Sequence, residues 1–310
     1  MRWFFLVVAL VCLPAAGQKP LKIVVPLAAG GTGDTLARLL AEELARLLGG
    51  AVIVENRPGS GGTIGTEAVA RSAPDGQTLL HTSASHIANA ALRPKLAYDA
   101  IRDFAVIART ADTHQLLVAH PSFPPNTVQE LILFCKSNQV FYGSSGNGSS
   151  THLNMELLKS LAGIDITHVP YKGSTQSRTD LLAGQIQLTV DGLLPTLPHI
   201  RAGKLKAIAL TSSRRSAAAP EVPTIAEAGV PGYQSDTWYA LFSPVAVPQK
   251  VLEDLRRASE TALRSAALRE KFLQQGAEPT DPSPAKLGEI MRADYARWAK
   301  LVRDAQIKVD

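Results

Sequence analysis

Cysteine is scarce in this sequence: the chain has 310 residues and contains only Cys12 and Cys135. Cys12 lies in an N-terminal segment that we expect to be removed, which would leave Cys135 as the only thiol. A single cysteine forms no internal disulfide and builds no cysteine metal site. The protein must therefore be stabilised by its hydrophobic core, and we predict neither a bound metal nor a cofactor.

Long apolar runs are also nearly absent. Residues 3–13 form one, preceded by the positive charge of Arg2 and followed by small residues at positions 14–17. This order is typical of a secretory signal peptide, and the run is shorter than the roughly 20 residues that a membrane span needs. We therefore predict that residues 1–17 are a signal peptide and that the protein is exported.

Concentrated charge and enzyme signatures are missing as well. The net charge is only +5 and no basic stripe is interleaved with aromatics, so we expect no nucleic-acid partner. The sequence has no dinucleotide fingerprint, no phosphate loop and no zinc-binding histidine pair, and Asn147 stands where a nucleophile elbow needs glycine. We predict no catalytic residue. The alternative is an exported hydrolase or isomerase with Ser145 or Ser83 as nucleophile and His152 as base.

The rest of the chain is organised around residues 21–48. Residues 21–26 predict a buried strand, residues 28–33 form a glycine-rich loop, and an amphipathic helix opens with Asp34 as its expected N-cap. A helix that begins in such a loop directs free backbone N–H groups outward and can hold an anion. The loop has no cation and no nucleophile, so it predicts binding.

The rest of the chain alternates strands with helices, which predicts an α/β architecture with mostly parallel sheets. Proline-rich residues 121–125 read as a linker, and an apolar strand at 238–242 reads as the return crossing. We therefore predict two α/β lobes joined by two crossing strands, with a ligand cleft between them. Lobe 1 comprises residues 18–120 plus 238–310, whose C-terminal helices pack on it, and lobe 2 comprises residues 121–237.

Polar loops follow several predicted strands. Three Gly/Ser-rich loops, at 30–34, 59–63 and 144–151, precede helices, and residues 83–86 add a fourth polar loop. Ligands bind at the carboxyl ends of strands in open α/β sheets, so opposing loops could offer N–H and hydroxyl donors to a carboxylate. For each loop taken alone, ordinary turn and capping residues are the better explanation. As a group, on an exported chain with two lobes, they favour anion binding.

Three residues outside these loops are ambiguous. Asp191, at the end of a strand, suits either a ligand hydrogen bond or a helix cap. Tyr171 suits core packing or a cleft wall, and His152 suits a helix start better than a catalytic base.

A series of short motifs carries a family resemblance. The chain resembles the Bug-type solute receptors, which are the TctC-like substrate-binding components of tripartite tricarboxylate transporters. The motifs run from about residue 20 to the C-terminus, and their order is specific although each is weak alone. They comprise residues 24–26 with 30–34, 54–62, 73–76, 146–152, 168–173, 197–203, 222–224 and 229–233.

The resemblance implies a periplasmic-binding-protein type II-like fold and a periplasmic receptor that closes on a small carboxylate. It implies one carboxylate in the first loop and the opposing end held by residues 83–86, 145–151 and 191. Leu27 and Gly192 depart from the usual phenylalanine and asparagine of the family. The predicted ligand-binding residues are Pro26, Ala29, Gly30, Gly31, Thr32, Asp34, Ser83, Ser85, Ser145, Gly146, Asn147, Gly148, Thr151, Tyr171 and Asp191.

These observations favour a monomeric, non-enzymatic receptor that captures a mono-, di- or tricarboxylate and delivers it to a membrane permease. A receptor that serves a signalling partner is a further alternative.

Overall fold

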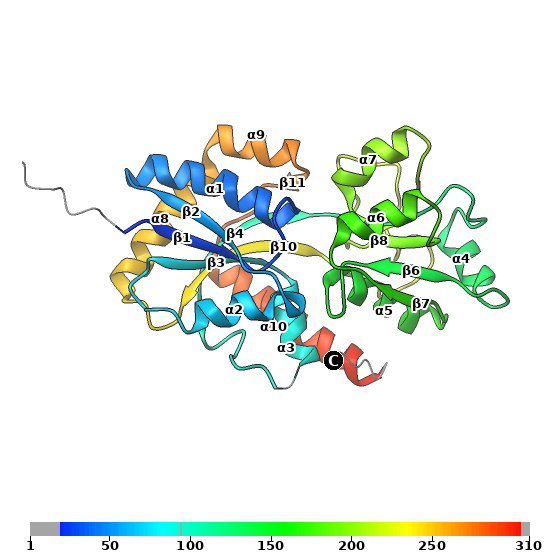
Figure 1. Ribbon diagram of the computed structural model, residues 1–310, viewed down its shortest axis with the longest axis horizontal. Helices are drawn as coiled ribbons and strands as arrows, with labels where there is room; N and C mark the ends of the chain where they lie inside the picture. Colours follow the sequence, from blue (N-terminus) through cyan, green and yellow to red (C-terminus); the bar gives the residue numbers. More distant parts are fainter. Residues whose placement is uncertain (1–18, 94, 305–310) are drawn as a thin grey trace, which may run out of the picture.

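The structure is a computed structural model that describes residues 19–93 and 95–304. The predicted signal peptide, residues 1–17, lies outside the described residues. Figure 1 shows two lobes side by side, each built around its own sheet and covered by helices on both faces. The two-lobe α/β class predicted from the sequence is confirmed.

Lobe 1 contains a sheet of six strands in the order β11-β4-β10-β3-β1-β2. Its apolar strands are buried on both faces; Ile23 and Leu79, for example, have no exposed surface. The strands are β1 (Leu21–Val25), β2 (Val52–Asn56), β3 (Thr78–Ser83), β4 (Phe104–Thr113), β10 (Thr237–Pro244) and β11 (Ala277–Glu278).

Two helical layers cover this sheet, and each forms its own hydrophobic cluster with it. One layer packs through residues such as Leu40 and Phe272, and it comprises α1 (Thr32–Leu48), α8 (Gln249–Arg264) and α9 (Ala266–Gln274). The other packs through residues such as Val69 and Ile87, and it comprises α2 (Thr63–Ala70), α3 (Ser85–Leu92) and α10 (Pro284–Asp304). A single 3₁₀ turn, η1 (Ser60–Gly62), precedes α2.

Lobe 2 repeats this layered plan with a sheet of five strands in the order β7-β6-β8-β5-β9. Its strands are β5 (Gln115–Ala119), β6 (Phe141–Ser144), β7 (Thr167–Pro170), β8 (Leu188–Gly192) and β9 (Lys206–Leu210). One face packs on α4 (Val128–Phe134) and α5 (Ser150–Ala162), and the other on α6 (Ser174–Leu182) and α7 (Leu193–Arg201).

The expectation of mostly parallel sheets is wrong. Strands β1, β2 and β3 are parallel, as are β6, β7 and β8. The strands that pass between the lobes enter each sheet in the opposite direction, so β10 and β5 are antiparallel to their neighbours. Each sheet is therefore mixed, because a chain that leaves one lobe and returns must run both ways.

The first crossing also lies earlier than predicted. Strand β5 pairs with β8 and β9 in lobe 2, and only His114 separates it from β4 in lobe 1. The boundary at residue 120 is therefore a correction: residues 115–120 belong with lobe 2, and residues 121–125 are a loop within it. The return crossing comes just before Thr237, where β10 begins.

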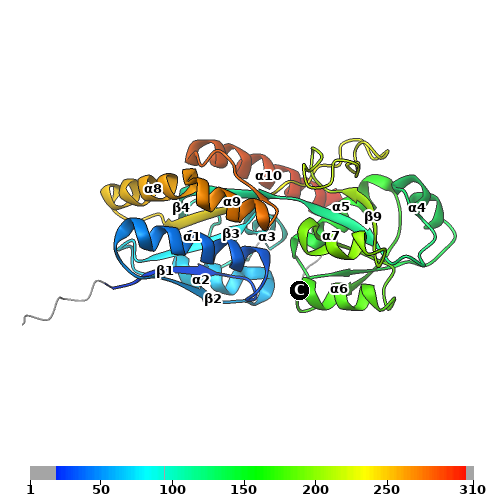
Figure 2. The ribbon, with the colours of Figure 1, turned by 90° about the horizontal axis from the view of Figure 1, so that it is seen from above.

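The last helix contacts both lobes, which the prediction of a tail confined to lobe 1 missed. Leu287 and Met291 at the start of α10 pack in a lobe 1 cluster. Trp298 and Leu301 near its end belong to a cluster made mainly of lobe 2 residues, which also includes Ala88 and Leu92 of α3 in lobe 1. Figure 2 shows α10 running along the back of the molecule from one lobe toward the other.

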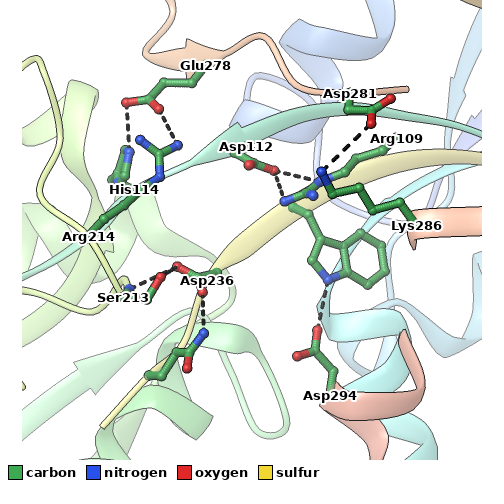
Figure 3. Close-up of polar contacts among 12 residues, drawn as sticks. Arg109, Asp112, His114, Ser213, Arg214, Asp236, Glu278, Asp281, Lys286 and Asp294 are labelled. Atoms are coloured by element: carbon green, nitrogen blue, oxygen red, sulfur yellow. Dashed lines mark hydrogen bonds and ion pairs between the residues drawn. The ribbon is translucent and has the colours of Figure 1, made fainter. Parts of the chain in front are cut away.

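A polar network joins the lobes beside the first crossing. Glu278 of β11 accepts one hydrogen bond from His114, at 2.9 Å, and another from Arg214, which follows β9 in lobe 2. The other ring nitrogen of His114 lies 2.9 Å from the hydroxyl of Ser212 in lobe 2. Burial raises the pKa of Glu278, but Arg214 and His114 outweigh it and hold the pKa below its ordinary value. Figure 3 shows the Glu278 carboxylate joined by dashed lines to both His114 and Arg214.

Candidate ligand-binding cleft

A cavity of about 880 Å³ lies between the two lobes. Lobe 1 lines it with the loops that follow β1, β2 and β3, and lobe 2 with the loops that follow β6, β7 and β8. These loops sit at the carboxyl ends of parallel strands, which is where α/β sheets place ligands. The polar loops singled out from the sequence therefore share one cavity.

All the predicted site residues line this cavity except Asp34 and Gly148. Their contact with a ligand stays a prediction. Residues 59–62 also line it, and so do several that sequence reasoning missed: Gln115, Lys172, Arg178 and Tyr239.

The first loop presents the start of α1 to the cavity. The helix begins at Thr32, with Gly31 as N-cap and no side chain capping it, so the prediction that Asp34 is the N-cap is wrong. N–H groups in the first turn of a helix have no intrahelical acceptor and lie at the positive end of its dipole. Gly31, Thr32 and Gly33 all line the cavity, so this end of the helix is a place for an anion.

Asp34 instead stabilises the loop without lining the cavity. Its carboxylate accepts a hydrogen bond from the Gly30 N–H at 2.9 Å and another from Arg38 at 3.1 Å. Arg38 also donates to Asn56, whose amide donates to the Leu27 carbonyl. Burial raises the pKa of Asp34, but the hydrogen bonds from Arg38 and Gly30 outweigh it and hold the pKa below its usual value. Asp34 thus shapes the loop without lining the cavity.

Glycine is required where α2 packs beneath this loop. A Cβ on Gly65 would lie 2.6 Å from the Arg57 carbonyl oxygen and 2.9 Å from the Pro26 side chain. Such distances are too short for carbon and oxygen atoms, so any other residue would displace Pro26. Gly65 is therefore a packing requirement behind the cavity wall.

Hydroxyl groups form the two polar walls that face each other. In lobe 1, Ser83 and Ser85 are buried and share a hydrogen bond of 2.9 Å. In lobe 2, Thr151 accepts from the Ser145 N–H at 2.8 Å and its hydroxyl lies 3.0 Å from that of Ser145. Ser149 caps α5 by accepting from a first-turn N–H. Both walls therefore offer hydroxyl donors and acceptors.

The proposed serine–histidine pair of the enzyme alternative is not formed. His152 accepts from the Gly148 N–H at 3.1 Å and stacks on His168, with ring centroids 4.1 Å apart, while Ser145 bonds to Thr151. His168 lies 2.6 Å from the hydroxyl of Ser144, but that serine has no exposed surface. Burial, with His152 and Lys159 nearby, lowers the pKa of His168 to about 3. This histidine cluster is neutral and packed.

The third wall contains a charge pair. Asp191, at the end of β8, is 2% exposed and accepts two hydrogen bonds from Arg178 of α6, at 2.6 and 3.2 Å, plus one from the Gly192 N–H at 2.7 Å. Burial raises the pKa of Asp191 and Arg178 opposes that rise. Arg178 lies on the same face of its helix as buried Leu181. An arginine on a buried helix face indicates an acidic partner, and this signal in the sequence could have predicted the pair.

The rims of the two lobes touch beside the cavity. A Cβ on Gly276 of lobe 1 would lie 2.0 Å from the Leu194 side chain of lobe 2. On the opposite rim, a Cβ on Gly61 would lie 3.5 Å from the Asn147 carbonyl oxygen. The lobes are therefore closed over the cavity at these points.

Within residues 19–93 and 95–304, no helix combines the length and the apolar character that crossing a membrane requires. The same residues contain no group of three or more His, Cys, Asp or Glu side chains arranged to hold a metal ion.

Two α/β lobes whose strand-end loops line one shared cavity have the arrangement of a solute-binding receptor. The model of the TctC family, described as tripartite tricarboxylate transporter family receptor, matches residues 36–307. The chain belongs to this family. Among its relatives, BugT of Bordetella pertussis is 36% identical over 295 residues, which cover 94% of this chain and 90% of BugT.

Solved structures of similar proteins have the same fold. An R. palustris protein determined with adipate has a TM-score of 0.86 and 35% identity, covering 93% of this chain and 98% of its own. MatC from Rhodopseudomonas palustris, determined with bound malate, has a TM-score of 0.84 and 35% identity, covering 91% of this chain and 98% of its own. The resemblance inferred from the motifs is confirmed.

Proposed function

We propose that this protein is a periplasmic receptor that binds a small organic carboxylate between its lobes and delivers it to the membrane permease of a tripartite tricarboxylate transporter. The observation that carries the proposal is the start of α1, which has no side-chain cap and lines the cavity with Gly31, Thr32 and Gly33. A carboxylate accepts hydrogen bonds from first-turn N–H groups and is favoured by the helix dipole. Adipate and malate in the two similar structures are both carboxylates.

A receptor role fits the chemistry of the cavity better than catalysis. The serine and histidine that a hydrolase would use do not meet, and the loop at α1 contains neither a nucleophile nor a base. Export by the segment at residues 1–17, a monomeric state, and the transporter as destination form part of the proposal and rest on the sequence and the family.

Thermal unfolding against a library of mono-, di- and tricarboxylates tests ligand binding. A ligand that binds only the folded state raises its stability by about 2.7 kcal/mol when present at 100 times its dissociation constant, so a matching acid should raise the melting temperature by several degrees. Each acid is compared with its uncharged amide. No shift with any acid, or equal shifts with acid and amide, would contradict the proposal.

The partner is tested separately by retention of solubilised membrane proteins on the immobilised receptor, with and without the matching acid. Ligand-dependent recovery of the permease supports delivery for transport. Recovery of a sensor protein instead would favour the signalling alternative.

A further inference from the structure

Arg178 has hydrogen-bonding capacity left over in the cleft. Its Nε and Nη2 atoms donate to Asp191, whereas Nη1 makes no hydrogen bond to the described residues. A guanidinium presents more N–H donors than one carboxylate accepts in this geometry. The side chain is 16% exposed and lines the cavity, so its remaining donors can be reached from the cavity.

Asp191 fixes where these donors lie. It is almost completely buried, and its carboxylate accepts two hydrogen bonds from Arg178 and one from the Gly192 N–H. A planar guanidinium held by two bonds on one edge cannot rotate freely. The Arg178 side chain has therefore already lost its conformational entropy before a ligand binds, so binding does not have to order it.

The wall around this pair is positively charged. Lys172 and Arg178 line it, and Asp191 is the only carboxylate among the described residues that line the cavity. Lys172 precedes α6, whose N-cap Gly173 offers no side-chain cap. The lobe 2 wall therefore has an excess of one positive charge, and it faces a helix start in lobe 1 that also favours an anion.

We propose that Arg178 anchors a second carboxylate of the ligand, so that this receptor selects dicarboxylates over monocarboxylates. The inference rests on the proposed function, since the first carboxylate lies at the start of α1. The second accepts hydrogen bonds from the outer edge of Arg178 across the cleft. Asp191 acts as a positioning residue that orients the guanidinium.

Isothermal titration with matched pairs of acids tests the selectivity. Succinate and butyrate, adipate and hexanoate, and suberate and octanoate differ within each pair by one terminal carboxylate at constant chain length. A charge-assisted pair in a confined site is worth about tenfold in affinity or more. We expect the protein to prefer the diacid of the best-fitting pair by at least about tenfold.

The variants separate anchoring from general charge. Removing Arg178 alone would leave Asp191 buried without a cation, so the test uses the double variant R178Q/D191N, which removes both charges at similar volume. The preference for the diacid should fall to about threefold or less, while affinity for the monoacid changes little. R178K keeps the cation but not the fork and should retain only part of the preference. The control is R264Q, which removes an exposed arginine paired with Glu260 on α8 and should keep the full preference.

The outcomes are distinct. Equal affinity for diacids and monoacids in the unmodified protein, or a full preference in folded R178Q/D191N, overturns the role of Arg178 and leaves carboxylate binding in place. Failure of every acid to bind overturns both the inference and the proposed function. If the double variant does not fold, a preference retained in full by R178K overturns the fork geometry, and a partial loss supports it.

Discussion

Contact between the lobe rims makes a sharp prediction about closure. Gly276 lies in the turn between α9 and β11 with φ of +61°, and a Cβ there would meet the Leu194 side chain at 2.0 Å. Carbon atoms in contact stay about 3.5–4.0 Å apart, so Gly276→Ala must push the rims apart by roughly 1.5 Å or force Leu194 to repack. We expect the closed state, and with it the bound state, to be weakened.

The size of the effect follows from two separate costs. Placing a side chain in the left-handed region costs about 1–2 kcal/mol, and this cost falls on stability whether or not ligand is bound. Overpacking costs about 1–3 kcal/mol and falls mainly on the closed form. The second cost predicts a loss of affinity of roughly 5- to 150-fold, since about 1.4 kcal/mol corresponds to a factor of ten.

Two variants separate the costs. Gly49, at the end of α1, has φ of +64°, and a Cβ there would meet no atom within 4 Å, so Gly49→Ala shows the backbone strain alone. The double variant Gly276→Ala with Leu194→Ala removes the clash but keeps the strain, and Leu194→Ala alone completes the cycle. Urea unfolding should show similar losses for the two glycine variants. Titration with the matching acid should show weaker binding only for Gly276→Ala, recovered in the double variant.

Unchanged affinity in Gly276→Ala would refute the reasoning, because it would mean that ligand binds without closing this rim. An equal loss of affinity in Gly276→Ala and the double variant would also refute it, since the loss would then not come from contact with Leu194.

The remaining predictions concern the loop and the last helix. Because the folded pKa of Asp34 is lowered, its ionised form contributes stability that is present above its unfolded pKa, near 3.8, and is lost as pH falls through the folded value. Asp34→Asn should therefore be less stable than the unmodified protein at pH 7 and approach it at pH 3 in urea unfolding; a constant difference would contradict this. Trp298→Ala should cost about 3–5 kcal/mol, because Trp298 is 5% exposed in a cluster that joins lobe 2 residues to α3 of lobe 1. The exposed Leu273 on α9 provides the control Leu273→Ala, and similar losses in both would contradict the packing role.

The sequence predicted the features that depend on short stretches of chain. A glycine-rich loop between a buried strand and an amphipathic helix has few alternative conformations, and β1 and α1 lie close to their expected positions. The site loops could be grouped because parallel strands bring their carboxyl ends to one edge. Both inferences need only local patterns and general topology.

Features that depend on distant partners could not be predicted in this way. The helical period showed that one face of α10 is buried, but a period does not say which lobe receives it. Arg178 and Asp191 belong to different elements, so their pairing appears only once α6 packs on β8. The first crossing was misplaced because proline-rich residues 121–125 look like a linker, whereas the chain passes between lobes at a single histidine inside an extended stretch.

The position of α10 constrains how the lobes can separate. If the two extended crossings were the only connection, the lobes could twist, slide and bend relative to one another. Helix α10 packs on lobe 1 through Leu287 and Met291, and its end, at Trp298 and Leu301, shares a cluster with residues of both lobes. A helix packed in this way opposes sliding and twisting and leaves one easy rotation. Binding and release of the ligand should then follow one hinge rotation, and the cavity should open on the side of the molecule away from α10.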